Sequence, residues 1–365
     1  MGEVLFIKPA NSSFIRKDEA FLARNYITSV FYFKSGAFGR LLLSEIALTF
    51  WLLRHIRSSK LIFIWFADYH SLIPALLAKL LKKRCAIVIG GYDAAKVPEL
   101  NYGAHLRRFR SFCTSTSCDL ADVILPVSVF TKRDILRFCH NRRCRVIYNG
   151  VNPLFFKMMG KKENLILTVC GADDVRTVLR KGVDFFAEIA RKIPDQGFVV
   201  VGMTGKARQF LEEKRIPNLR IIGRLTHEEL LTYYQKARIY CQLSAYEAFG
   251  LTLAEAMLCE CIPVGSNDGA TPEVIGDVGF IVESRCAAEV VKTIRRALSC
   301  GEELGRLARQ RMIENFSMCR REYALREIFD EMLCGPPMRP WHMGASRRIE
   351  PSSSSDKKSP EATSA

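Results

Sequence analysis

The sequence lacks the residue spacing of a zinc site. It has 13 cysteines and 6 histidines in 365 residues, but no two cysteines stand in a C-x-x-C pair and the histidines are scattered. Structural zinc needs ligands paired at such short spacings. No Asp-x-Asp occurs either, so no bridging divalent metal is indicated. We therefore expect no metal and no other cofactor, and we expect the cysteines to be thiols in a reducing cytosol.

Long apolar runs are missing as well. The most apolar stretch, residues 41–53, has thirteen residues and includes Glu45, whereas a membrane-spanning helix needs about 20 apolar residues. The first apolar run ends at Pro9 and is too short for the apolar region of a signal peptide. These observations predict a cytoplasmic protein.

Acidic residues are scarce in the first half of the chain. Residues 1–150 carry 23 Lys and Arg against 10 Asp and Glu, a net charge of +13, whereas residues 151–365 carry 31 against 28, a net charge of +3. The excess predicts a polyanionic partner such as a membrane surface or a phosphate-bearing substrate, although a solubilising surface charge explains it equally well. No nucleic-acid-binding motif occurs, so we expect no nucleic acid partner.

The segment 38–56 gives the membrane hypothesis a place in the chain. It is rich in Leu, Phe and Trp and is flanked by Arg40, Arg54 and Arg57. A helix of this kind can lie on the surface of an anionic bilayer. A buried helix of the first domain explains the same apolar residues, so both interpretations stay open.

Short apolar runs alternate with helical patterns along the whole chain. The runs that indicate buried parallel strands are 3–7, 61–66, 85–90, 123–127 and 145–149, and then 164–170, 197–202, 219–223, 238–243, 261–265 and 279–282. The helical patterns between them include 17–25, 38–56, 71–83, 181–193, 205–214, 226–236 and 251–259. Such alternation predicts an α/β protein with two Rossmann-like, doubly wound domains that face each other across a cleft.

The same pattern sets the expected domain boundaries. We predict a first domain over residues 1–150 and a second over 151–315, joined at the Asn-Gly and Asn-Pro turns of the linker. An amphipathic segment over 316–334 should form a closing helix that crosses back to the first domain. Residues 335–365 are rich in Pro and Ser without periodicity, and we predict that they are disordered.

Two loops of the second domain contain residues that suit an anion. Ligands of open α/β sheets bind beyond the carboxyl ends of the strands. The loop GADDVRTVLRKG carries Arg176 and Lys181 ahead of a helix opened by Gly182, which is a plausible diphosphate cradle. A solvated basic turn is the alternative. The loop GSNDGATPEVI places Thr271 in a flexible turn at the same end of the sheet, which makes Thr271 a donor-binding candidate.

A further loop reads SAYEAFGLTLAEAM and surrounds a glycine with two carboxylates. Gly250 lets the backbone approach a ligand at a helix start, where the N–H groups of Phe249, Gly250 and Leu251 can bind phosphate oxygens. Glu247 precedes the helix and Glu255 lies on it, so the two do not form an obvious acid/base pair. Carboxylates can instead bind the vicinal hydroxyls of a sugar nucleotide. Capping or solvating the helix is the simpler interpretation of Glu255.

The order of these motifs resembles a known enzyme family. The segments IYNGVNPLFF, RKGVDFF, GRLTHEEL, SAYEAFGLTLAEAM and CIPVGSNDGATPEVI follow one another as in the retaining GT-B glycosyltransferases of the group 1, or family four, type. The similarity covers residues 4–330 in layout and is strongest over 145–282. It implies transfer of a hexose from a nucleotide-sugar donor to a glycan or lipid-linked acceptor, with retention of anomeric configuration.

The resemblance also implies roles for individual residues. Glu247 would contact the donor sugar and Glu255 the ribose hydroxyls, while Lys181 would neutralise the donor diphosphate. Arg176 would share that task, although the arginine of the family stands one place earlier, where this chain has Val175. The remaining implied donor contacts are the main-chain N–H groups of Phe249, Gly250 and Leu251, and Gly223 beside the base.

The acceptor side departs from the family pattern. The family often has a glycine pair in its first loop, where Ser12 and Ser13 stand here. Many members have an H-G-x-D stretch, in which Gly90 replaces the histidine while Asp93 is kept. His70 could serve in place of that histidine. The acceptor-side candidates are therefore Ser12, Ser13, His70 and Asp93.

Two other functions stay open. The same fold could serve a sugar-nucleotide epimerase or hydrolase, which needs no acceptor. A basic membrane-binding protein without catalysis is the second alternative, and the presence of both the E-x7-E and the RKG motifs argues against it.

Overall fold

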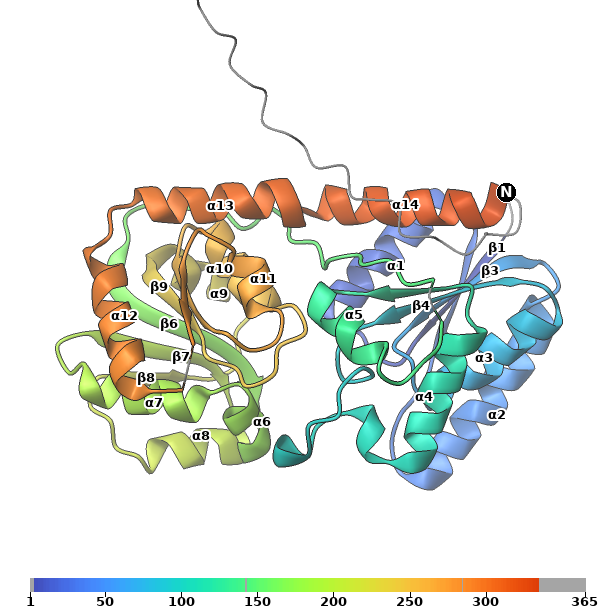
Figure 1. Ribbon diagram of the computed structural model, residues 1–365, viewed down its shortest axis with the longest axis horizontal. Helices are drawn as coiled ribbons and strands as arrows, with labels where there is room; N and C mark the ends of the chain where they lie inside the picture. The colour runs from blue at the N-terminus through green and yellow to red at the C-terminus, as the bar shows by residue number, and fades with distance from the viewer. Residues whose placement is uncertain (1–2, 142, 284, 335–365) are drawn as a thin grey trace, which may run out of the picture.

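The structure is a computed structural model that describes residues 3–141, 143–283 and 285–334, so the predicted disorder of 335–365 lies outside it. Two parallel sheets stand side by side along the long axis, each flanked by helices (Figure 1). In spatial order, the first sheet contains β2 (Thr28–Tyr32), β1 (Glu3–Lys8), β3 (Ser59–Trp65), β4 (Arg84–Ile89) and β5 (Val123–Pro126). The second contains β11 (Phe280–Val282), β10 (Ile262–Ser266), β9 (Ala237–Gln242), β6 (Glu163–Ala172), β7 (Gly197–Met203) and β8 (Leu219–Ile222). The predicted fold class is confirmed.

Helices link the successive parallel strands. The first domain has α1 (Ser13–Asn25), α2 (Phe38–His55), α3 (Tyr69–Leu80), α4 (Arg108–Leu120) and α5 (Val129–Ile135). The rest of the described chain has α6 (Val175–Arg180), α7 (Val183–Lys192), α8 (Gly205–Glu212), α9 (His227–Lys236), α10 (Leu251–Leu258), α11 (Thr271–Ile275), α12 (Ala287–Ser299), α13 (Glu303–Phe316) and α14 (Met318–Cys334). None of the helices described is both long and apolar enough to cross a membrane.

At the edges of the first sheet, one strand was not predicted and one predicted strand is absent. The sequence pattern misses β2 because an edge strand is half-exposed, and its residues alternate between partly buried and exposed instead of forming an apolar run. The segment 145–149 is not a strand. It runs beside β5, with the N–H of Arg145 donating to the carbonyl of Ile124 at 3.0 Å, and then leaves the sheet as the interdomain linker.

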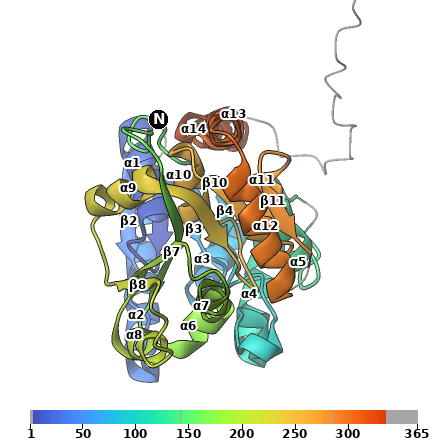
Figure 2. The ribbon, with the colours of Figure 1, turned by 90° about the vertical axis from the view of Figure 1, so that its left-hand side faces the viewer.

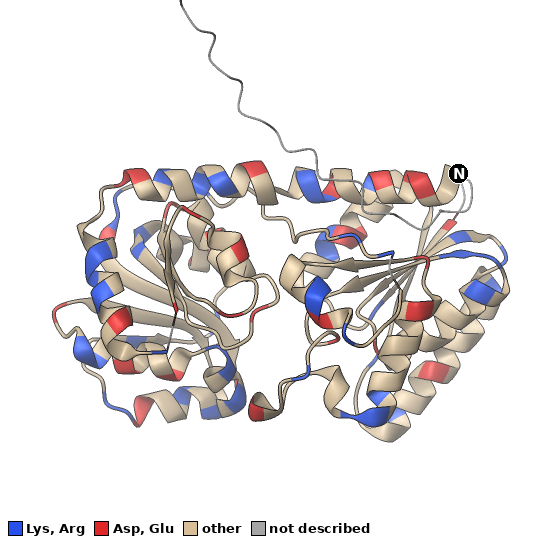
Figure 3. Ribbon diagram, in the orientation of Figure 1, with Lys and Arg blue, Asp and Glu red and all other residues tan. Residues whose placement is uncertain are grey.

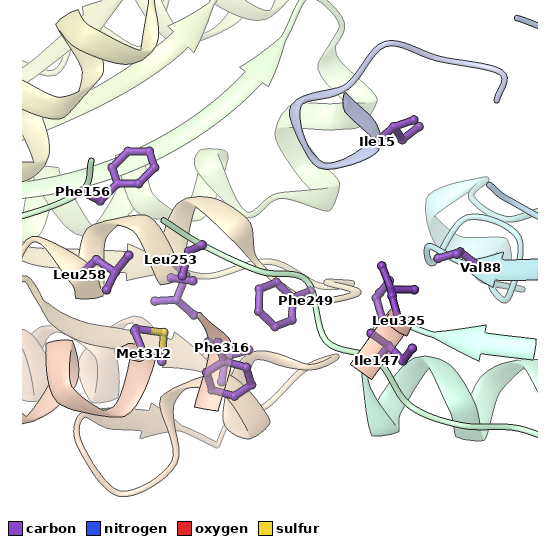
Figure 4. Packing of buried hydrophobic residues seen from close by; sticks show 14 of the residues in the cluster. Ile15, Val88, Ile147, Phe156, Phe249, Leu253, Leu258, Met312, Phe316 and Leu325 are labelled. Carbon is purple, nitrogen blue, oxygen red and sulfur yellow. The ribbon is translucent and has the colours of Figure 1, made fainter. Parts of the chain in front are cut away.

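The hydrophobic core continues from one domain into the other. Buried Val4 and Phe6 of the first sheet belong to the same cluster as Phe249 and Leu253 of the second domain, with α13 and α14 between them. Figure 4 shows side chains of this cluster from both domains. The inner strands are buried on both faces because helices cover both sides of each sheet.

The chain crosses between the domains twice, and the two crossings lie side by side. The N–H of Val151 donates to the carbonyl of Phe316 at 2.9 Å, and the N–H of Met318 donates to the carbonyl of Val151 at 2.9 Å. A Cβ on Gly150 would lie 2.8 Å from the Cα of Met318, so the close approach requires glycine. α13 and α14 lie end to end over the two domains in Figure 1, and Figure 2 looks along them.

A buried ion pair fastens α14 to the first domain. The guanidinium of Arg321 binds the carboxylate of Asp18 on α1 through two hydrogen bonds, of 2.8 Å from Nε and 2.6 Å from Nη2. Trp65 Nε1 donates to the same carboxylate at 2.8 Å. Arg321 Nη1 reaches the carbonyls of Ile147 and Tyr148 in the linker. The pair therefore ties α1, β3, the linker and α14 together.

Removal of one member of this pair should destabilise the protein strongly. We expect Asp18→Asn to lower the free energy of unfolding by about 3–5 kcal/mol, because the guanidinium of Arg321 stays buried without its counter-charge. Urea unfolding followed by circular dichroism measures the change. The matched control is Arg24→Ala, which removes the exposed ion pair with Glu322 between the same two helices and should cost under about 1 kcal/mol. Equal losses in the two variants would contradict the assignment.

Candidate active site

The RKG turn is held against the end of β9. Gly182 has φ +66° and precedes α7, and a Cβ there would lie 1.8 Å from the carbonyl oxygen of Leu243. Only glycine permits this approach. The N–H of Ala245 also donates to the carbonyl of Arg180 at 2.9 Å. These contacts place Lys181 directly beside the SAYEAFG loop.

Lys181 and Glu247 form an ion pair. Lys181 Nζ donates to Glu247 Oε2 at 2.6 Å, and the two side chains are 24% and 10% exposed. Gln242 Nε2 donates to the same oxygen at 3.2 Å, and Ser244 Oγ donates to it at 3.4 Å. A nearly buried carboxylate thus holds the ammonium at the carboxyl ends of β6 and β9. The structure brings these two predicted residues together.

The loop before α11 supports Glu247 from the other side. The N–H of Ala270 donates to the carbonyl of Glu247 at 2.8 Å. Thr271 is fully buried, and its Oγ1 has no hydrogen-bond partner among the described residues. Gly250 has φ +87° and precedes α10, so the predicted backbone donors Phe249, Gly250 and Leu251 lie at a helix start next to Glu247. Three loops of the second sheet therefore converge around Glu247.

Glu255 has different surroundings from Glu247. It is 5% exposed on α10 and accepts a hydrogen bond from the hydroxyl of Tyr234 at 3.1 Å. Burial raises the pKa of Glu255 to about 7, against the opposing effects of Lys17 on α1 and of the Tyr234 hydrogen bond. Lys17 Nζ itself donates to the carbonyl of Gly150 at 3.1 Å. The second glutamate thus lies where α1 of the first domain meets the second domain.

The other two donor candidates are less enclosed. Arg176 is exposed on α6. Gly223 follows β8, and its carbonyl accepts from the N–H of Gly202 at 3.1 Å. A Cβ on Gly223 would meet no atom within 4 Å.

The acceptor-side candidates fall into two groups. Ser12 and Ser13 are half-buried at the start of α1, and Asp93 lies in the turn after β4. The Asp93 carboxylate accepts from the N–H groups of Ala67, Gly90 and Gly91 at 2.7–3.2 Å, and burial raises its pKa to about 6. It therefore organises this turn.

His70 is placed as a packing residue of the first domain. Its side chain is buried, its Nε2 lies 3.0 Å from the carbonyl oxygen of Trp65, and its ring packs on Phe33 with the centroids 5.2 Å apart. Burial lowers the pKa of His70 and favours the neutral ring. The suggestion that it substitutes for the missing histidine of the first domain therefore has no support in the geometry.

Sequence reasoning missed the contacts that join the two domains at the site. The hydroxyl of Tyr246 donates to the carbonyl of Gly91 at 3.2 Å and lies 3.0 Å from Asp134 Oδ2 on α5. The Tyr246 ring also packs on Tyr102, and the guanidinium of Arg180 lies 4.5 Å above the Tyr102 ring. In the sequence, the only indication of these contacts is the tyrosine immediately before Glu247. The loops of both sheets thus meet at their carboxyl ends.

Two family models match this chain in succession. Glycosyltransferase Family 4 matches residues 8–154, which hold the first sheet apart from most of β1, and Glycosyl transferases group 1 matches residues 157–316, which hold the second sheet. The chain belongs to the group 1 glycosyltransferases. The resemblance to group 1 glycosyltransferases expected from the sequence is confirmed.

Curated relatives of this group 1 glycosyltransferase are distant. A phosphatidylinositol N-acetylglucosaminyltransferase subunit of Homo sapiens is 28% identical over 172 residues, which cover 44% of this chain and 35% of the relative. An uncharacterized glycosyltransferase of Methanocaldococcus jannaschii is 25% identical over 268 residues, which cover 71% of this chain and 72% of the relative. The match with the human relative therefore spans about a third of its length.

Solved structures share the fold at low identity. Sucrose-phosphate synthase from Thermosynechococcus elongatus has a TM-score of 0.77 at 16% identity, with 92% of this chain and 100% of the other covered. Anabaena Alr3699/HepE in complex with UDP-glucose has a TM-score of 0.71 at 13% identity, with coverages of 91% and 100%. These similarities establish the two-sheet arrangement.

In this group 1 glycosyltransferase, the local packing at Gly90 matches the absence of a histidine at that position. A Cβ on Gly90 would lie 2.1 Å from the Phe66 ring, so the ring occupies the space where the side chain of a histidine would begin. Phe66 has φ +66°, a left-handed conformation that is uncommon for an aromatic residue.

No set of three or more His, Cys, Asp or Glu side chains in the described part of the chain could hold a metal ion.

Glu255 should make stability depend on pH. Because burial raises its pKa from 4.5 to about 7, the native state keeps a proton that the unfolded chain loses between these values, and stability falls as the pH rises through that range. Glu255→Gln removes the loss. We expect the free energy of unfolding of Glu255→Gln minus that of the parent to increase by about 3 kcal/mol between pH 4.5 and pH 8. Urea unfolding at several pH values measures this change.

The control for this prediction is Glu213→Gln, which replaces an exposed glutamate of the second domain. Its stability difference from the parent should stay constant with pH. The assignment fails if the difference for Glu255→Gln is equally constant.

Proposed function

We propose that the protein transfers a hexose from a nucleoside-diphosphate sugar to a hydroxyl of a glycan or lipid-linked acceptor, in the cytoplasm and with retention of configuration. The observation that carries the proposal is the Lys181–Glu247 pair of 2.6 Å, held between two helix starts at the meeting point of the sheets. A lysine beside backbone N–H groups is suited to a diphosphate.

The donor would take over the contacts that Lys181 and Glu247 now make with each other. The diphosphate would bind Lys181 and the N–H groups of Phe249, Gly250 and Leu251 at the start of α10. Glu247 would then be able to accept a hydrogen bond from a hydroxyl of the donor sugar. Glu255 would accept the ribose hydroxyls, and buried Thr271 offers a further hydroxyl whose hydrogen-bonding capacity is unused within the described residues.

The reaction would proceed without a protein nucleophile. The bond from the anomeric carbon to the diphosphate breaks as the bond to the acceptor oxygen forms on the same face of the sugar. The acceptor proton passes to the departing phosphate oxygen. Lys181, with Arg176 on the exposed side of α6, would stabilise the negative charge that develops on the diphosphate. We therefore propose that no divalent metal is required.

Loss of the lysine should impair donor binding. We expect Lys181→Ala to weaken the binding of the preferred sugar nucleotide by about tenfold or more, because a charge-assisted hydrogen bond contributes about 1.5–3 kcal/mol. A thermal-shift panel of UDP-, GDP- and ADP-linked sugars identifies the donor, and titration calorimetry then gives the affinity. Lys192→Ala, on the exposed end of α7, is the control. Unchanged affinity in Lys181→Ala would refute the site.

The reaction itself has two expected signatures. Release of nucleoside diphosphate should depend on an added acceptor extract and should survive excess EDTA, because the positive charge comes from side chains. The product of an α-linked donor should be an α-glycoside by NMR. Release without acceptor would indicate a sugar-nucleotide epimerase or hydrolase, and loss of activity in EDTA would contradict the metal-independent mechanism.

A further inference from the structure

Helix α2 has two apolar faces. Ser44, Leu48 and Leu52 face the interior and are buried. Large apolar side chains also recur at intervals of three and four residues on the opposite side, which is the spacing of a single helix face. This outer stripe consists of Phe38 (79% exposed), Leu42 (51%), Leu43 (70%), Ile46 (45%), Phe50 (70%) and Leu53 (55%). A contiguous exposed apolar surface of this kind marks an interaction site in a soluble domain.

Cations border the outer stripe. Arg40 stands three residues before Leu43 and Arg54 four residues after Phe50, so each lies next to the stripe on the helix surface. Both arginines are exposed, as are Lys34 before the helix and Arg57 after it. In Figure 3 most of α2 is free of charged residues along its length. The surface therefore combines an apolar centre with a positive border.

Glu45, the single acidic residue of α2, does not present its carboxylate to the outer surface of the helix. The carboxyl oxygens of Glu45 are shielded from solvent without a hydrogen-bond partner among the described residues. Burial and the nearby carboxylate of Asp68, which caps α3, raise the pKa of Glu45 to about 7. The outer stripe itself contains no acidic residue.

The start of the stripe also lies near the carboxyl ends of two strands of the first sheet. A depression of about 510 Å³ lies at the carboxyl ends of β1 and β2, beside the start of α2. It is lined by Pro9, Tyr32, Lys34, Ser35 and Arg40. A surface that contacts the outer stripe near Phe38 would bring its own anionic groups to Lys34 and Arg40.

We propose that α2 docks the first domain on an anionic lipid bilayer. The outer stripe enters the region between the headgroups and the acyl chains, and Arg40, Arg54 and Arg57 bind lipid phosphates. The net charge of +13 on residues 1–150 favours this partner over a neutral apolar surface. The docking does not depend on the proposed transferase reaction, because none of its residues belongs to the donor site.

Co-sedimentation with vesicles tests the proposal. The parent protein should sediment with vesicles of equal parts phosphatidylcholine and phosphatidylserine, remain in solution with phosphatidylcholine alone, and be released by high salt. The partition coefficient of the variant Phe38→Ser/Leu43→Ser/Phe50→Ser onto these vesicles should be lower by about tenfold or more, because three exposed apolar side chains are lost. The variant Arg40→Gln/Arg54→Gln should bind several-fold more weakly and depend less on salt.

The matched control changes exposed leucines elsewhere. Leu154→Ser/Leu307→Ser alters side chains that are 83% and 46% exposed in the linker and on α13, and should leave vesicle binding unchanged. Circular dichroism and donor affinity should be the same in every variant. The proposal is overturned if the parent ignores anionic vesicles, if the control loses binding equally, or if light scattering shows a dimer that the triple serine variant dissociates.

Discussion

The arrangement of the two domains depends on the buried pair of Asp18 and Arg321 beside the double crossing of the chain. Arg321 is only 4% exposed, and a buried guanidinium is tolerated here because the carboxylate of Asp18 contacts it through two hydrogen bonds. The guanidinium also donates to two linker carbonyls, and Trp65 Nε1 donates to the carboxylate of Asp18. α14 therefore remains attached to the first domain, whereas α13, which precedes it, packs on α10 of the second. The crossing at Gly150 leaves no room for a side chain, so the linker and the junction between α13 and α14 form one joint between the domains.

The joint has consequences at the carboxyl ends of the two sheets, where the loops of both domains meet. Tyr246 of the second domain binds the backbone of Gly91 and lies beside Asp134 in the first, and it immediately precedes Glu247 in the chain. A change in the angle between the domains would separate Tyr246 from these partners and move the carboxylate that binds Lys181. Tyr246 therefore links the position of Glu247 to the turn after β4 in the first domain.

Charge is distributed differently inside and outside the protein. Lys181, Glu247, Lys17 and Glu255 lie at the domain junction, where burial makes each charge depend on a partner of opposite sign or on hydrogen bonds. In the proposed reaction, the diphosphate and the ribose of the donor take over those partners. On the outside of the first domain, by contrast, cations border an apolar helix face whose outer stripe contains no acidic residue. The two proposals therefore concern one enclosed and one open surface of the same chain.

The sequence by itself determined the fold class, most strands and the two loops around Lys181 and Glu247, because alternating apolar runs and glycine-bearing turns are local signals. It could not determine the edge strand β2, whose half-exposed residues give no apolar run, or the extended linker segment 145–149, whose apolar residues mimic a strand. Only the tertiary structure decided that His70 packs in a core, that Phe66 occupies the space beside Gly90, and that Tyr246 joins the domains. These are contacts between residues far apart in the chain, and a local pattern contains no information on which distant side chain fills a given space.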